Sequence, residues 1–231
     1  MRLVMTYLKR SLLVLVAVAA CLGVSGILPA PLQFLSAASA DDILKGGKWE
    51  FLTESKGVKV WKKDVPGLEF PGFRGRTTIN ASIERILEVM MDSSKHADWM
   101  YRCKESRILK EISDTEAVIY TRVDAPWPVW DRDAVMRTTM RYNADRTSLV
   151  MKFRHAKNPE KYKKTPEGVI RMPRLAGRYQ LDQVGPNKTT ILYEAVSDIG
   201  GSIPTWIANL GSRDLPAITL SRLRDRVYGK I

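Results

Sequence analysis

The sequence predicts an α+β fold in which a long, curved antiparallel β-sheet lies against one long C-terminal helix. Two observations carry this prediction. Between residues 103 and 196, apolar and polar residues alternate in several successive segments that are separated by short turns. Alternation of this kind is typical of half-buried strands, and consecutive strands joined by short turns pair antiparallel. The last segment, residues 203–228, instead has apolar residues at helical spacing.

Residues 1–40 form a separate segment that takes no part in this fold. They carry Arg2, Lys9 and Arg10 but no acidic residue, residues 12–28 are apolar, and residues 38–40 read Ala-Ser-Ala. This pattern predicts a secretory signal peptide, and hence an exported domain, in the periplasm or cell envelope, made of residues 41–231.

Two other interpretations of the leader stay open. Residues 18–21 read Val-Ala-Ala-Cys and resemble a lipoprotein signal, in which Cys21 is acylated. Residues 12–28 are also just long enough to span a bilayer as an uncleaved anchor.

Composition excludes several classes of protein. Apolar residues make up 45% of the chain, which rules out intrinsic disorder. Beyond the leader there is no second long apolar stretch, which rules out a multi-pass membrane protein. Outside the leader Cys103 is the only cysteine, so the domain has no internal disulfide.

The charge of the chain points to anionic partners. The formal net charge is +12, and subtracting the three basic residues of the leader leaves +9. An exported domain rarely meets nucleic acid, so we expect transient contact with an anionic membrane surface, no nucleic-acid partner and a monomeric domain.

Each element has its own local signal. Residues 41–55 look like a short helix containing Trp49, and residues 94–102 look like another. Ser82 is a suitable N-cap for a helix whose apolar residues fall at i, i+3, i+4, i+7 and i+8: Ile83, Ile86, Leu87, Met90 and Met91. The predicted strands are residues 57–62, 70–79 (with glycines that suggest a turn and a bulge), 103–112, 116–123, 134–142, 149–153, 169–181 and 189–196.

The final helix is expected to span residues 203–228. Pro204 falls in its first turn, where a missing N–H does no harm. Pro216 lies in its interior, and a proline there predicts a kink or a break.

One face of the strand 134–142 is rich in methionine: Ala134, Met136, Thr138, Met140 and Tyr142. A sheet that curls around a single helix tends to leave a space, and methionine suits the wall of an irregular pocket. An ordinary core is the other interpretation of the same residues.

Two motifs resemble one known family. Residues 125–133 read APWPVWDRD and residues 197–209 read SDIGGSIPTWIAN. Both resemble segments of START domains (steroidogenic-acute-regulatory-related lipid transfer), and the similarity extends over about residues 49–227.

The resemblance implies a helix-grip fold with a tunnel that holds a single lipid. Residues 126–130 and 203–223 correspond to the lid of such a domain. The ligand-binding residues expected on this basis are Trp127, Val129, Met136, Met140, Tyr142, Met151, Phe153, Tyr179, Tyr193, Ile203, Ile207, Leu210 and Ile218.

The resemblance also bears on the ligand. Members that hold phosphatidylcholine use aromatic residues for its ammonium group, whereas Ala134 and Met136 stand where such members tend to have tyrosines. A sterol, a fatty acid or another smooth apolar ligand is therefore expected rather than a choline lipid.

We expect no enzyme activity, metal or cofactor. His96 and His155 have no second ligand at metal-binding spacing, and neither a nucleophile elbow nor a phosphate-binding loop is present. Two alternatives remain. The first is an enzyme of the cyclase or hydratase type that uses Tyr142, Tyr179, Tyr193 or Glu194, and the second is an envelope interaction module with a basic face, for which the candidates are Lys157, Lys161, Lys163 and Lys164.

Overall fold

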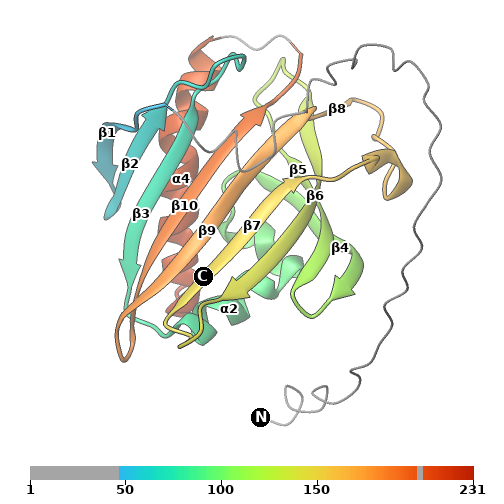
Figure 1. Cartoon of the computed structure of the whole chain (residues 1–231). Helices are drawn as coiled ribbons and strands as arrows, with labels where there is room; N and C mark the ends of the chain where they lie inside the picture. Colours follow the sequence, from blue (N-terminus) through green and yellow to red (C-terminus); the bar gives the residue numbers. More distant parts are fainter. Residues whose placement is uncertain (1–46, 202–204) are drawn as a thin grey trace, which may run out of the picture. The chain divides into compact units, whose positions relative to one another are not determined.

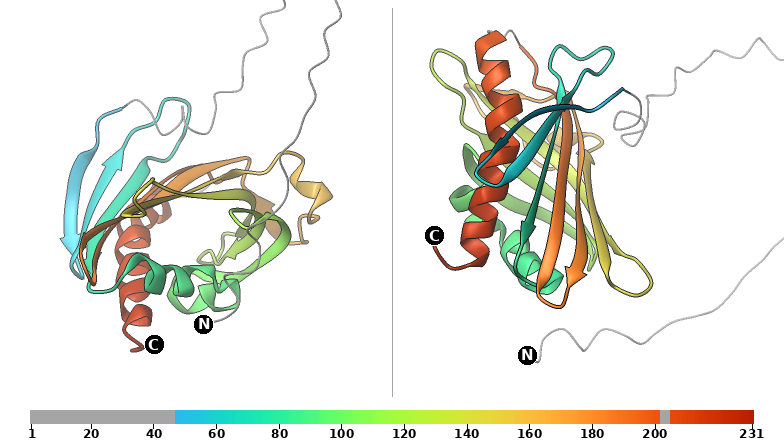
Figure 2. Two further views of the ribbon diagram at one scale, coloured as in Figure 1. Left: turned by 60° about the horizontal axis from the view of Figure 1, so that its bottom comes forward. Right: turned by 90° about the vertical axis from the view of Figure 1, so that its left-hand side faces the viewer.

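The structure is a computed structural model that describes residues 47–201 and 205–231. Its strands form one sheet in the order β1-β2-β3-β10-β9-β7-β6-β5-β4, and β8 pairs with β6 beside this path. Every neighbouring pair along the path is antiparallel, and β8 is parallel to β6. The sheet arches over the helices, with α4 on its concave side (Figures 1 and 2). The predicted fold class is confirmed.

The strands are β1 (Glu50–Ser55), β2 (Val58–Lys63), β3 (Gly72–Ile79), β4 (Cys103–Ser113), β5 (Glu116–Val123), β6 (Asp131–Tyr142), β7 (Ser148–His155), β8 (Val169–Arg171), β9 (Arg174–Gly185) and β10 (Lys188–Asp198). The helices are α2 (Ile83–Met91), α3 (His96–Trp99) and α4 (Thr205–Val227), with 3₁₀ turns at Ser93–Lys95 and Pro159–Lys161.

The segment that precedes β2 was predicted as a helix, and for residues 50–55 that prediction is wrong. These residues form β1, which pairs with β2 at one edge of the sheet. The ring of Phe51 packs edge-to-face on the ring of Trp61, with centroids 5.8 Å apart. A cross-strand aromatic pair stabilises strands, and here it outweighs the weak helical pattern. Residues 41–46 lie outside the described residues.

A second difference concerns residues 169–181, which were predicted as one strand. They divide into β8 and β9, with Met172 and Pro173 between them. Proline has no N–H to donate to a neighbouring strand, so it interrupts the ladder. β8 instead pairs with the first residues of β6.

Pro216 does not break the final helix, because α4 continues through it. The proline packs on β3, where a Cβ atom placed on Gly75 would stand 2.9 Å from the Cβ of Pro216. β3 pairs with β2 and β10 in continuous register through Gly75, so this glycine permits a close helix contact rather than a bulge. Pro204 lies outside the described residues.

The packed part of the molecule lies where α4 covers β2 and β3 and meets α2. The N-cap of α2 is confirmed, since the Ser82 side chain accepts a hydrogen bond from the Arg85 N–H. The most deeply buried apolar side chains here are Val58, Val60, Ile79, Ile83, Ile86, Leu149, Leu181, Ile191, Leu220 and Leu223. In the described part of the chain, none of the helices has the length and apolar character needed to cross a membrane.

Candidate functional site

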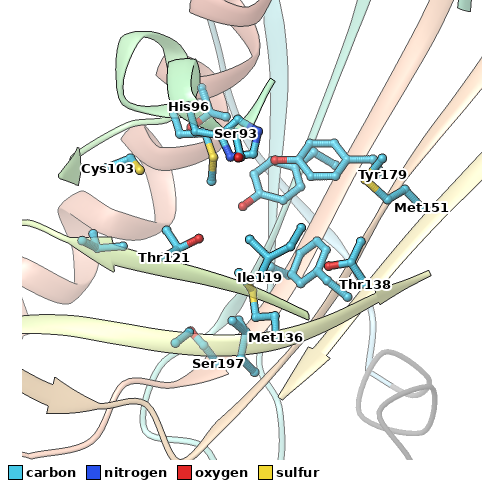
Figure 3. Close-up of a pocket in the computed structure, with 18 of the residues that line it drawn as sticks. Ser93, His96, Cys103, Ile119, Thr121, Met136, Thr138, Met151, Tyr179 and Ser197 are labelled. Atoms are coloured by element: carbon cyan, nitrogen blue, oxygen red, sulfur yellow. The ribbon is translucent and has the colours of Figure 1, made fainter. Parts of the chain in front are cut away.

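A cavity of about 800 Å³ lies beneath the part of the sheet that arches away from α4. Strands β5, β6, β7, β9 and β10 line one side of it, and α3 and α4 contribute to the other. Figure 3 shows how Ile119, Met136, Met151 and Tyr179 surround this space. α4 packs mainly on β2 and β3, and the cavity lies under the parts of the sheet that α4 and α2 do not cover.

The methionine-rich face of β6 lies on the cavity wall. Ala134, Met136, Thr138 and Met140 all line the cavity, as alternation along a strand requires. Seven of the predicted ligand-binding residues contribute to the lining: Val129, Met136, Met140, Met151, Phe153, Tyr179 and Tyr193.

Three predicted residues lie outside the lining. Trp127 is 90% exposed on the loop before β6. Tyr142, at the end of β6, carries the guanidinium of Arg146 over its ring, 4.0 Å from the centroid. Ile218 is half-buried on α4 without reaching the cavity. Ile203 lies outside the described residues, and the side chains of Ile207 and Leu210 on α4 are likewise not described.

The prediction missed lining residues from several other elements. β5 contributes Ala117, Ile119, Thr121 and Val123. These residues alternate along the strand, so the sequence pattern could have predicted that they share one face. Lining residues from further elements, for which no local pattern pointed to a cavity, are Phe73, Met90, Trp99, Met100, Cys103, Leu215 and Thr219.

Tyr179 and Tyr193 form the aromatic centre of the cavity wall. Their rings are stacked, with centroids 4.3 Å apart and an interplanar angle of 5°. Burial, with a further contribution from the neighbouring Tyr193, raises the pKa of Tyr179 well above its usual value. Burial likewise raises the pKa of Tyr193 to about 12. Both side chains are therefore neutral hydroxyls at physiological pH.

Glu194, a candidate for the enzyme alternative, does not line the cavity. It follows Tyr193 on β10 and therefore points to the opposite face of the sheet. There its buried carboxylate pairs with Arg74 and Arg178. The carboxylate thus holds three strands together on the convex face.

His96 is a buried histidine with both ring nitrogens engaged. Its Nδ1 lies 2.8 Å from Ser106 Oγ, and its Nε2 lies 2.8 Å from the carbonyl oxygen of Met90. Burial lowers its pKa, which favours the neutral ring. Within the described residues, no group of three potential metal ligands is close enough to hold an ion.

Three ion pairs anchor the first residues of β6. Asp131 accepts hydrogen bonds from Arg122 Nε at 2.8 Å and from Lys104 Nζ at 3.1 Å. Asp133 is fully buried and accepts from Arg171 Nε at 2.5 Å and from Arg171 Nη2 at 3.0 Å. The pairs tie β6 to β4, β5 and β8.

Arg132 connects the two sequence motifs. Its guanidinium donates hydrogen bonds to the carbonyl oxygens of Trp130, Ile199 and Gly200, the last at 3.1 Å. The first carbonyl belongs to the loop before β6 and the other two to the segment that leads into α4. Arg132 is 4% exposed and lines the cavity, so it joins the two segments at one end of the hollow.

The fold and the cavity define a helix-grip protein with a largely apolar interior cavity. The START domain family model matches residues 44–213, and the chain belongs to that family.

Related proteins fit this assignment. An uncharacterized protein of Pseudomonas aeruginosa is 35% identical over 176 residues, which cover 76% of this chain and 85% of that protein. The bovine phosphatidylcholine transfer protein is 22% identical and aligns with 74% of this chain and 80% of its own.

Among solved structures, a STAR-related lipid transfer protein fragment from Xanthomonas axonopodis is 29% identical, with a TM-score of 0.69 over 78% of this chain and 98% of the fragment. Human StAR-related lipid transfer protein 5 shares the fold at 17% identity, with a TM-score of 0.69 over 82% of this chain and 93% of that chain.

Proposed function

We propose that this protein binds one hydrophobic lipid in the cavity and carries or senses it in the cell envelope. The observation that supports this most directly is the cavity itself, about 800 Å³ in volume and lined by methionine, aliphatic and aromatic side chains. Its size falls within the range of pockets that enclose small ligands. Names of related proteins point the same way, since two of them are lipid transfer proteins.

The proposal includes no chemical step. Tyr179 and Tyr193 keep their protons at physiological pH because burial raises their pKa values. The Glu194 carboxylate faces away from the cavity and is paired with two arginines. Of the residues named for the enzyme alternative, the two that line the cavity, Tyr179 and Tyr193, are therefore neutral hydroxyls suited to binding.

Native mass spectrometry of the purified full chain tests lipid binding. We expect one co-purified lipid per chain, or uptake of one from a lipid panel after extraction, on a monomeric protein. Thr138→Phe places a ring in the cavity and should lower occupancy. Thr139→Phe adds the same ring on the exposed face of the same strand and should not. Empty protein that takes up no lipid would contradict the proposal.

We further propose that the loop before β6 docks on an anionic membrane. β8 runs parallel to the start of β6, with Val169 opposite Asp131. The loop of residues 125–130 and the basic segment of residues 157–164 therefore lead into neighbouring parallel strands from the same end of the sheet. The exposed tryptophans and lysines there are Trp127, Trp130, Lys157, Lys161 and Lys164, with Tyr162 and one acidic residue, Glu160, exposed among them.

Both residue types suit a membrane interface. Tryptophan is favoured at the headgroup level, and each basic residue near an anionic surface contributes about 1 kcal/mol. Pro126 and Val129 of the same loop line the cavity. This docking would therefore place that end of the cavity at the membrane surface.

Vesicle flotation of the full chain with phosphatidylglycerol vesicles tests the docking. Trp127→Ala should weaken binding several-fold because it removes a side chain that is 90% exposed. Val184→Ala is the matched control. Val184 is 56% exposed and lies near the C-terminal end of β9, away from the loop of residues 125–130. Equal loss in the two variants, or in neither, would argue against this loop.

We also propose that residues 1–40 direct export and are removed after Ala40. The mass of the protein isolated from its own cells distinguishes the three fates of the leader: cleavage after Ala40, acylation at Cys21 or retention as an anchor. A cytoplasmic protein of full length would contradict export.

A further inference from the structure

We propose that the cavity selects an uncharged lipid, one that carries hydroxyl, carbonyl or ester oxygens, and that it excludes anionic phospholipids and ionised fatty acids. This inference rests on the proposed function and names its ligand class. It arises from a contrast in charge between the cavity wall and the rest of the molecule.

The charged residues in the lining are mostly acidic, although the chain as a whole has a net charge of +12. Among the described residues, four carboxylates and two guanidiniums line the cavity: Glu111, Asp114, Glu116, Asp124, Arg102 and Arg132. Two of these carboxylates are paired with cations outside the lining, Glu116 with Arg137 and Asp124 with Lys104. Glu111 and Asp114 have no ion pair among the described residues and give the rim its negative charge. An anionic headgroup would be attracted to the outer surface and repelled at the cavity.

Both guanidiniums of the lining already have partners. Arg102 Nη1 lies 3.4 Å from Asp124 Oδ2. Arg132 donates to three backbone carbonyl oxygens. A phosphate or carboxylate brought inside would have to break these contacts to gain a positive partner, and a buried charge without one is costly.

Three of the carboxylates belong to one rim, formed by the β4–β5 hairpin. Glu111 and Asp114 are exposed there, and Glu116 pairs with Arg137. The hydrogen bond from Arg137 lowers the pKa of Glu116, which keeps that carboxylate ionised. An anionic headgroup left at this rim, with its chains inside, would face the carboxylates of Glu111 and Asp114.

The interior does offer uncharged hydrogen-bonding groups. The hydroxyls of Thr121, Thr138 and Ser197 line the cavity, and Tyr179 extends into it from β9 (Figure 3). The Tyr179 hydroxyl interacts with that of Tyr193. The indole Nε1 of Trp99 is buried, and no hydrogen-bond partner for it occurs in the described part of the chain.

An indole N–H can only donate, so the group that satisfies Trp99 is an acceptor oxygen. A ligand hydroxyl, carbonyl or ester supplies one without bringing a charge. The acidic rim lies at the β4–β5 hairpin, where Glu116 pairs with Thr139 of β6, whereas the loop of residues 125–130 lies at the other end of these strands. Its carboxylates therefore act on a headgroup at the hairpin end of the cavity.

Matched lipid pairs test this selectivity on the full chain. Hexadecanol is compared with palmitate, and dioleoylglycerol with dioleoylphosphatidic acid, each by competition against a bound fluorescent lipid. We expect the neutral member of each pair to bind at least about tenfold more tightly at pH 7. Palmitate binding should strengthen as the pH falls toward about 5, where its carboxyl begins to take up protons, while hexadecanol binding stays constant.

Variants separate the two parts of the inference. Glu111→Gln with Asp114→Asn, both at the exposed rim, should improve binding of the anionic member and leave the neutral one unchanged. Trp99→Phe and Tyr179→Phe should weaken hexadecanol several-fold relative to hexadecane, which has no oxygen. Equal or tighter binding of the charged lipids would overturn the selectivity. Failure of every lipid to bind would instead contradict the proposed function.

Discussion

Cys103 shows how the cavity wall alters the chemistry of a single side chain. The residue lines the cavity and is buried. Burial raises the pKa of its thiol to about 11, so the reactive thiolate is scarce at neutral pH.

We therefore expect Cys103 to react with iodoacetamide at pH 7.5 far more slowly than an unfolded cysteine, on the order of a hundredfold. Peptide mapping by mass spectrometry follows this cysteine separately from Cys21. The same protein in urea provides the control and should react rapidly. Rapid modification of the folded protein would show that the thiol is not held in an apolar wall.

Gly75 carries a second prediction at the scale of one residue. A Cβ atom there would lie 2.9 Å from Pro216 Cβ and 3.0 Å from Leu220 Cδ1. Gly75→Ala should lower the free energy of unfolding by about 1–3 kcal/mol, because α4 must shift away from β3. Gly185→Ala is the control, since its nearest neighbour would be 3.4 Å away, and urea denaturation measures both. Equal stability of the two variants would contradict this contact.

At the scale of elements, one end of the cavity depends on the link that Arg132 makes between two segments. One side chain holds the loop before β6 and the glycine-rich turn before α4 through three backbone carbonyl oxygens. Gly200 and Gly201 both have positive φ, 64° and 67°, a conformation that glycine adopts without strain. The turn can therefore bring its carbonyl groups to the guanidinium.

Arg132→Lys should loosen this end of the cavity. Lysine keeps the charge but cannot reach three carbonyl oxygens with the fixed geometry of a guanidinium. We expect faster release of bound lipid, several-fold or more, and a loss of stability of about 1–3 kcal/mol. Stopped-flow transfer to acceptor vesicles measures release, with Arg141→Lys on the exposed face of β6 as the control. An unchanged release rate would mean that Arg132 has only a structural role.

At the scale of the whole molecule, the proposed binding to a membrane and the proposed binding of a lipid depend differently on charge. The chain carries a net positive charge, whereas the wall of the cavity, in which we propose that the lipid binds, is largely apolar. Salt screens charges at an exposed surface within about 10 Å at 0.1 M, but it leaves apolar burial largely intact.

Raising the salt from 0.05 M to 0.5 M should therefore release the protein from phosphatidylglycerol vesicles without emptying the cavity. Flotation and native mass spectrometry of the same samples measure the two properties. Neutral phosphatidylcholine vesicles are the control and should show weak binding that is insensitive to salt. If the salt that releases the protein from the vesicles also removed the bound lipid, the two interactions would not be independent and the prediction would be wrong.

Most of the fold could be predicted from the sequence because most of its signals are local. The alternation along β4, β5, β6 and β10 determined those strands, and Ser82 with the apolar spacing after it determined α2. The same alternation identified the cavity face of β6, and hence Met136 and Met140. Each of these depends only on which residue type stands at which spacing.

The tertiary structure decided what depends on distant segments meeting. β1 became a strand because Trp61 is there to pair with Phe51, and Pro216 is tolerated because Gly75 faces it. The burial of Arg132 and the acidic sign of the cavity rim also emerged only in three dimensions. These residues come from separate strands and loops, and no local pattern records which of them share a surface.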